Sequence, residues 1–145
     1  MNSQLTLSNE LRKLVEARIE HTLEGIEETL RHILETQEIS LKDLKEDIKS
    51  LEESFTLLSQ KWNLEILYTL FLKNSTSFSG LKKILGVNSR TLSDKLKSLK
   101  RYGYVERTVE TGPPLRVKYT LTTKGKNTVL LALPLLYYSS SLISL

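Results

Sequence analysis

The apolar residues of the N-terminal part of the chain recur at alternating steps of three and four, the period of an amphipathic helix that packs along one narrow face. This repeat is interrupted after Gln37. Ser40 can cap a new helix there, with Asp43 at the third helical position, as in a capping box. We therefore predict two helices, over residues 8–37 and 41–59, although one long helix with a stutter also fits the pattern.

The apolar face of these helices needs a partner, because an isolated amphipathic helix is only marginally stable in water. We expect that partner to be a second copy of the chain in a homodimer, and folding back on the same chain is the alternative. The residues that we assign to this dimerisation face are Leu23, Ile26, Leu30, Ile33, Leu41, Leu44, Ile48, Leu51, Phe55 and Leu58.

Two further helices are predicted in the middle of the chain. Residues 61–74 place Trp62 and several large aliphatic side chains at helical spacing, and the polar run that follows ends this helix. A short helix comes next, with Ser79 as its predicted N-cap and Gly86 as the left-handed residue that terminates it.

A third helix of this group begins at a cap provided by Asn88 or Ser89 and stops near Gly103. Its leucines share one face, which we expect to be buried, and they are Leu92, Leu96 and Leu99. At about 100° per residue, the opposite face carries Arg90, Asp94, Lys97 and Arg101.

Two alternating, β-branched segments follow, over residues 104–110 and 116–125, around a Gly-Pro-Pro turn. Arg107, Arg116 and Lys118 place cations on these strands. Two helices joined by a Gly-containing turn form a helix-turn-helix pattern. With a preceding helix and a following β-hairpin, the pattern predicts a winged helix, in which the hairpin is the wing.

The charges of the chain are unevenly distributed. Residues 1–58 carry a net charge of −6 and residues 59–145 a net charge of +10, although the whole chain carries only +4. Such asymmetry favours a basic module that binds a polyanion. We predict that double-stranded DNA is this partner, with the third helix in the major groove and the wing on flanking phosphate or in the minor groove.

The residues that we assign to DNA binding are Asn88, Ser89, Arg90, Thr91, Asp94, Lys95, Lys97, Arg101, Arg107, Arg116 and Lys118. A solvated basic surface helix is the plain alternative for this stretch. An adaptor that uses its winged helix to bind another protein, rather than DNA, is the second functional hypothesis.

The C-terminal residues 127–145 carry no charge, and Pro134 interrupts their apolar run. That run is shorter than the roughly 20 residues needed to span a bilayer. We predict an apolar helix, kinked near Pro134, that packs in the dimer interface. A membrane anchor is the alternative.

Several kinds of chemistry find no support in the sequence. The chain contains no cysteine, which excludes disulfides, thiolate nucleophiles and cysteine-ligated metals. We find no secretory signal and expect a cytoplasmic protein. Because nucleotide-binding and metalloprotease motifs are absent, we expect neither an enzyme nor a cofactor or metal site. A small-molecule effector cannot be named from the sequence.

Residues 61–125 contain five ordered sequence blocks: the Lys-Trp pair with Glu-Ile-Leu at 65–67, FSGLKK at 78–83, SRTLSDKLKSL at 89–99, GYVER at 103–107, and Pro-Pro at 113–114 with RVKYTLTTKG at 116–125. In these blocks the chain resembles the HxlR-type winged-helix transcription regulators, within the wider group that includes the MarR-type proteins. The resemblance implies a dimeric DNA-binding regulator whose third helix in this module reads the major groove.

This chain departs from the family pattern in three ways. It lacks the cysteine that many members carry before the Lys-Trp pair, so redox sensing there is excluded. An additional residue, Leu115, separates Pro-Pro from Arg-Val in the wing. The long acidic helices at the N-terminus are also not typical of the family.

The predicted fold is mainly α with a small β-hairpin, an α+β winged helix-turn-helix with added helices. We divide the chain into an acidic, coiled-coil-like dimerisation region (1–58), a DNA-binding domain (59–126) and an apolar C-terminal helix (127–145).

Overall fold

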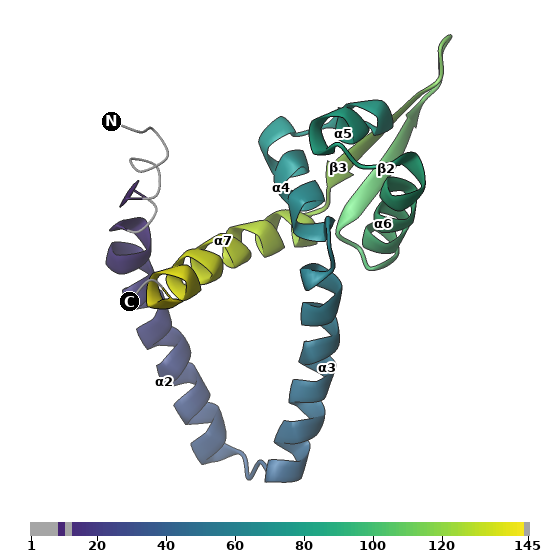
Figure 1. The fold of residues 1–145 in the computed structure, drawn as a ribbon. Coiled ribbons are helices and arrows are strands. Elements are labelled where there is room, and N and C mark those ends of the chain that lie inside the picture. Colours follow the sequence, from purple (N-terminus) through teal and green to yellow (C-terminus); the bar gives the residue numbers. More distant parts are fainter. Residues whose placement is uncertain (1–8, 11–12, 144–145) are drawn as a thin grey trace. The chain divides into compact units, whose positions relative to one another are not determined.

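The computed structural model describes residues 9–10 and 13–143 of the chain (Figure 1). These residues form two compact parts, each described separately below. One part comprises residues 52–130, and the other comprises the described residues of 1–51 and 131–145. Residue 8, at which we expected the first helix to begin, lies outside the described residues.

Two helices separated by a short non-helical segment form the N-terminal region, as predicted. A π-helical turn, η1 (Val15–Ile19), leads into α2 (Glu20–Thr36), and α3 spans Leu41–Ser59. Gln37 adopts an extended backbone and ends α2. Ser40 then caps α3, because its Oγ accepts a hydrogen bond from the Asp43 amide at 3.2 Å and donates one to the Asp43 carboxylate at 2.7 Å.

Three helices build most of the second part: α4 (Asn63–Lys73), α5 (Phe78–Leu85) and α6 (Ser89–Arg101) (Figure 1). Each helix places its large aliphatic residues on one face, and these faces meet in a common core. The buried hydrophobic residues of this core are Leu57, Ile66, Leu67, Leu70, Leu81, Val87, Leu92, Leu96, Leu99, Tyr104, Val105, Tyr119 and Val129.

The junction between α3 and α4 is held by a buried asparagine. The Asn63 side chain is fully buried, and its Nδ2 donates a hydrogen bond of 2.7 Å to the Leu57 carbonyl oxygen. Trp62, immediately before α4, has a left-handed backbone with φ of 78°. A non-glycine residue in this conformation is uncommon and marks a sharp change in chain direction.

The predicted β-hairpin is confirmed, and the structure adds a third strand. Strands β2 (Val105–Glu110) and β3 (Arg116–Leu121) pair antiparallel, with Arg107 opposite Tyr119. A two-residue strand, β1 (Thr76–Ser77), pairs with the other edge of β3, which gives the order β1-β3-β2. From the sequence, the polar run that contains β1 predicted only the end of the preceding helix. The strand itself was not predicted, because two residues leave no alternating pattern.

This extra strand also corrects the predicted start of α5. Ser77, and not Ser79, is the N-cap, because Ser77 Oγ accepts a hydrogen bond from the Gly80 amide at 3.1 Å. The backbone of Ser77 is extended because this residue still pairs with β3. Gly86 ends α5 in the predicted left-handed conformation, with φ of 65°.

The end of the second hairpin strand is also corrected. The strand stops at Leu121, and α7 begins at Thr123 and continues to Ile143. Thr122 acts as a helix cap, with its Oγ1 accepting a hydrogen bond from the Gly125 amide at 3.0 Å. Threonine suits both strands and helix caps, so the β-branched pattern alone placed the boundary too late.

Residues 122–125 also hold the chain that follows α6. Lys124 Nζ donates a hydrogen bond of 2.8 Å to the Tyr102 carbonyl oxygen and lies 4.4 Å from the centre of the Tyr104 ring. Thr122 Oγ1 donates to the Gly103 carbonyl oxygen. The first turn of α7 is therefore connected directly to the C-terminal end of α6.

The C-terminal apolar segment is helical through residue 143, with Pro134 inside α7. Its kink and its packing in a dimer remain predictions. Within residues 9–10 and 13–143, no helix combines the length and apolar character that crossing a membrane requires.

Gly125 is expected to be essential for the close packing of the first turn of α7 against the Tyr104 backbone. A Cβ built at Gly125 would overlap the carbonyl oxygen of Tyr104, whereas a Cβ at Gly112 meets nothing within 4 Å. We expect Gly125→Ala to lower the free energy of unfolding by about 2–3 kcal/mol, because the rigid backbone must move. Gly112→Ala should change it by no more than about 0.5 kcal/mol. Urea denaturation of both variants tests this, and equal stabilities would contradict it.

Candidate nucleic-acid interface

The helix α6 is set in place by caps at both ends. Asn88 adopts an extended backbone, and its Oδ1 accepts a hydrogen bond from the Thr91 amide at 2.8 Å. At the other end, Gly103 has a φ of 84°, which glycine adopts without strain. Both caps match the prediction from sequence.

The leucines of α6 decide which of its side chains face the solvent. Leu92, Leu96 and Leu99 are 0%, 2% and 0% exposed. The opposite side of the helix carries four exposed residues, which we call the outward row: Arg90, Asp94, Lys97 and Arg101. The row presents three cations and one carboxylate on an element that the core holds rigidly.

The two faces of the hairpin carry different cations. Arg107 lies opposite Tyr119 and lines the same cleft as Val117 and residues of α6, so it is on the face toward α6. Side chains alternate along a strand, so Arg116 and Lys118 belong to the opposite face. There Lys118 Nζ forms an ion pair of 3.0 Å with a carboxylate oxygen of Glu110.

The remaining predicted site residues are less uniform in position. Ser89 is exposed at the start of α6, and Thr91 is half-buried. Asn88 is exposed, but its side chain is engaged in the cap. Lys95 is half-buried, and its Nζ donates a hydrogen bond of 3.3 Å to Gln60 Oε1, so it is directed away from the outward row.

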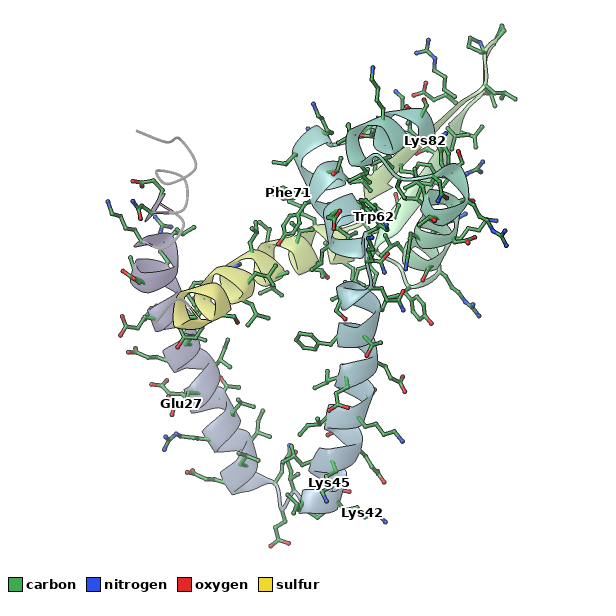
Figure 2. All side chains as sticks on the ribbon, in the orientation of Figure 1. Glu27, Lys42, Lys45, Trp62, Phe71 and Lys82 are labelled. Carbon is green, nitrogen blue, oxygen red and sulfur yellow. The ribbon has the colours of Figure 1, made fainter. Side chains whose placement is uncertain are left out.

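Two groups of cations were not assigned from the sequence. Lys82 and Lys83 are exposed in the last turn of α5, where Figure 2 shows Lys82 projecting from the helix. Lys100 of α6 lines the cleft between α6 and the hairpin. The sequence shows that all three are lysines, but only the positions of α5 and the hairpin show which surface each one reaches.

These helices, the three-stranded sheet and the outward row define a transcriptional regulator of the winged-helix type. The family described as HxlR-like helix-turn-helix matches residues 57–139, more than half of the chain. The chain belongs to this family, as the resemblance in its sequence motifs predicted.

Curated relatives carry the same class of function in their names. The chain is 39% identical over 71 residues to the uncharacterised HTH-type transcriptional regulator YvaP of Bacillus subtilis strain 168, covering 48% of this chain and 65% of YvaP. It is 30% identical over 75 residues to YdzF of the same organism, also named as an uncharacterised HTH-type transcriptional regulator, covering 51% of this chain and 69% of YdzF. The match thus leaves about a third of each relative uncovered.

Solved structures show the same fold. The reduced form of the transcriptional regulator YodB from B. subtilis superposes with a TM-score of 0.57 at 25% identity, covering 70% of this chain and 91% of YodB. A protein described as a MarR-family transcriptional regulator from Enterococcus faecalis V583 gives a TM-score of 0.58 at 28% identity, covering 66% of this chain and 86% of that one.

The N-cap of α6 can be tested separately from any ligand. We expect Asn88→Ala to lower the free energy of unfolding by about 1 kcal/mol, because the Thr91 amide loses its acceptor. Asn88→Ser keeps a capping oxygen and should stay within a few tenths of a kcal/mol of the wild type. Denaturant unfolding measures both values. An unchanged stability for Asn88→Ala would show that the cap contributes nothing.

Proposed function

We propose that this protein is a homodimeric regulator that binds double-stranded DNA in a sequence-specific manner. Residues 59–126 are the DNA-binding domain, α6 enters the major groove, and the hairpin contacts flanking phosphate or the minor groove. The observation that carries this proposal is the outward row, whose three cations are exposed on a helix held by buried leucines. A rigid basic helix beside a basic wing suits the dimensions of a major groove.

The position of each residue along α6 suggests its role. Arg90 lies in the first turn, from which a recognition helix contacts base edges, and arginine pairs bidentately with guanine. Asp94, one turn later, can accept a hydrogen bond from a cytosine amino group. Lys97 and Arg101 lie toward the C-terminal end, where we assign them to phosphate.

The hairpin cations differ in how free they are to bind DNA. Arg116 is exposed next to the turn of the hairpin. Lys118 is already paired with Glu110 at 3.0 Å, so part of its charge is neutralised within the protein. We therefore assign more of the wing's phosphate binding to Arg116 than to Lys118.

Dimerisation is supported by the unpaired apolar face of the N-terminal helices. None of the described side chains of α2 is buried, although Leu23, Ile26, Leu30 and Leu34 share one face and are each about half exposed. Leu34 extends the face that we predicted from the sequence, and Ile33 beside it is half-buried.

Exposed apolar side chains continue along α3, with Leu41 at 70% and Leu51 at 63% exposure. Contiguous exposed apolar surface of this kind marks an interaction site. A second copy of the chain buries it twice through one symmetric interface. Leu58 lies at the other end of α3, where it is half-buried next to the buried Leu57.

A two-fold symmetric dimer predicts a symmetric operator. Two α6 helices would enter successive major grooves about 34 Å apart, so the binding site should be an inverted repeat with half-sites one helical turn apart. Footprinting should show protection of both half-sites. Protection of a single asymmetric site would contradict symmetric docking.

Base reading and phosphate binding can be separated by mutation. Arg90→Ala should weaken binding to the operator by about 1–3 kcal/mol, and should weaken binding to random duplex much less, because an arginine–guanine pair is lost. Arg116→Ala should weaken both and lower the salt slope by about one, as expected for one lost phosphate contact. Lys118→Ala should have a smaller effect than Arg116→Ala.

These affinities are measured on operator and random DNA over a range of salt concentrations. Equal weakening of both duplexes by Arg90→Ala would show that Arg90 contacts only phosphate. Absence of any duplex binding at about 50 mM salt would instead favour the protein-interaction adaptor, because phosphate contacts are strongest at low salt.

The dimer interface can be tested on α3. Leu51→Glu should give a monomer in analytical ultracentrifugation at micromolar concentration, because the interface would bury an unpaired charge. Ser50→Glu places the same side chain about 100° around the helix from Leu51, outside the predicted apolar face, and should leave the dimer intact. A wild-type monomer, or a Leu51→Glu dimer of unchanged affinity, would contradict this interface.

A further inference from the structure

The turn of the β-hairpin, which we call the wing tip, comprises residues 111–115 and carries no charged side chain. The hairpin projects past the helices of this part of the chain, with the turn at its outer end (Figure 1). Every residue of the wing tip is exposed, and Leu115 is 72% exposed. A large apolar side chain is thus held in solvent at the far end of the wing.

A single exposed leucine is common on protein surfaces, so its setting decides whether it has a role. Leu115 lies beside a groove that Phe78 and Val117 also line, but its neighbours leave most of its surface in solvent. Leu115 is also the additional residue that separates Pro-Pro from Arg-Val in this wing. Its position, and not its contribution to the core, is therefore the feature to explain.

Two prolines stiffen the wing tip directly before Leu115. A proline ring fixes φ near about −65° and removes a backbone amide donor. A stiff segment loses less conformational entropy on binding than a flexible one. The two missing amides also leave fewer backbone groups that need a hydrogen-bond partner. The wing tip is therefore suited to enter a narrow and partly dehydrated groove.

The charges next to the wing tip favour a polyanionic partner. Arg116 follows Leu115 directly and is exposed. The acidic residue at this end of the hairpin, Glu110, lies opposite Arg116 in the strand register and is paired with Lys118 at 3.0 Å. Two cations and one carboxylate leave this end of the wing with a net positive charge.

We propose that Leu115 is a wedge that enters the minor groove of DNA and partly unstacks one base step. Proteins that bind this groove combine arginine or lysine with an inserted apolar side chain such as leucine, and the insertion bends the duplex by about 20–90°. Leu115 and Arg116, adjacent at the end of the wing, supply both elements. The wedge rests on the proposed function, in which α6 occupies the major groove and the wing lies on flanking DNA.

A wedge gives a sequence preference without a hydrogen bond to any base. Pyrimidine–purine steps, TA and CA/TG, kink and unstack most readily, so inserting Leu115 costs least there. We therefore expect the preferred binding site to contain such a step beside each half-site read by α6.

The wedge is tested on the full chain, with duplexes that the wild-type protein selects from random sequence. Permanganate oxidises unstacked thymines and so locates a kinked step, while energy transfer between dyes on the two duplex ends measures the bend. The wild type should make thymines beside each half-site reactive and should bend the duplex. A bound duplex that stays straight, with no reactive thymine, would overturn the proposal.

Two substitutions at position 115 separate insertion from phosphate binding. Leu115→Ser should remove the thymine reactivity and weaken binding to the selected duplex about tenfold, because burial of the leucine is lost. Its salt slope should not change, since no phosphate contact is removed. Leu115→Met keeps a side chain that can insert and should still bend the duplex. Bending and affinity that Leu115→Ser leaves unchanged would overturn the proposal.

Leu72→Ser is the matched control, because Leu72 lies on α4 and is 77% exposed. It should alter neither the bend nor the affinity. If Leu115 instead packs on Phe78 as a structural residue, Leu115→Ser lowers the urea midpoint of unfolding, which a wedge leaves unchanged. If a second copy of the chain covers Leu115, Leu115→Ser changes the sedimentation of the protein without DNA. Either result would overturn the wedge.

The same measurements distinguish the wedge from the proposed function. Binding of the wild type to duplex without a bend would overturn the wedge alone. Absence of any duplex binding by the wild type would overturn the proposed function and the wedge together.

Discussion

The burial of one face of α6 is the constraint on which the function of this fold depends. Leu92, Leu96 and Leu99 lie in the core with almost no exposed surface. Each buried leucine stabilises the fold by about 1.5–3 kcal/mol relative to an exposed one. Because helical side chains are separated by a fixed angle, burying this face also fixes the direction of Arg90 and Lys97.

The ends of α6 are held by different means. At the start, the Asn88 side chain satisfies a free amide of the first turn. At the end, hydrogen bonds from Lys124 and Thr122 reach the carbonyl groups of Tyr102 and Gly103. These contacts join the C-terminal end of α6 to the first turn of α7.

The two compact parts of the chain have different physical characters. The part around α4, α5 and α6 buries a continuous core and carries most of the positive charge. The N-terminal helices are acidic and leave their apolar face exposed in a single chain. Figure 2 shows charged side chains such as Glu27 on α2 and Lys42 on α3 projecting from these helices. Acidic surface on this region would also repel DNA, which keeps the proposed DNA contacts on the basic part.

Much of the fold could be predicted because its signals are local. Helical spacing of apolar residues, the caps at Ser40 and Asn88, and the glycines at 86 and 103 each act within a few residues. The same local geometry predicted which side of α6 is buried. The fold class and the family therefore followed from the sequence.

The sequence by itself thus determined the helices, the hairpin and the outward row of α6, since these follow from the angle between successive side chains and from capping chemistry. Only the tertiary structure decided features that join distant segments. The pairing of β1 with β3 moved the start of α5 to Ser77, Lys95 turned toward Gln60, and Glu110 paired with Lys118. The cleft likewise arises where α5, α6 and the hairpin meet. No periodic pattern records such contacts, because they depend on the distance between elements in space and not on the spacing of residues along the chain.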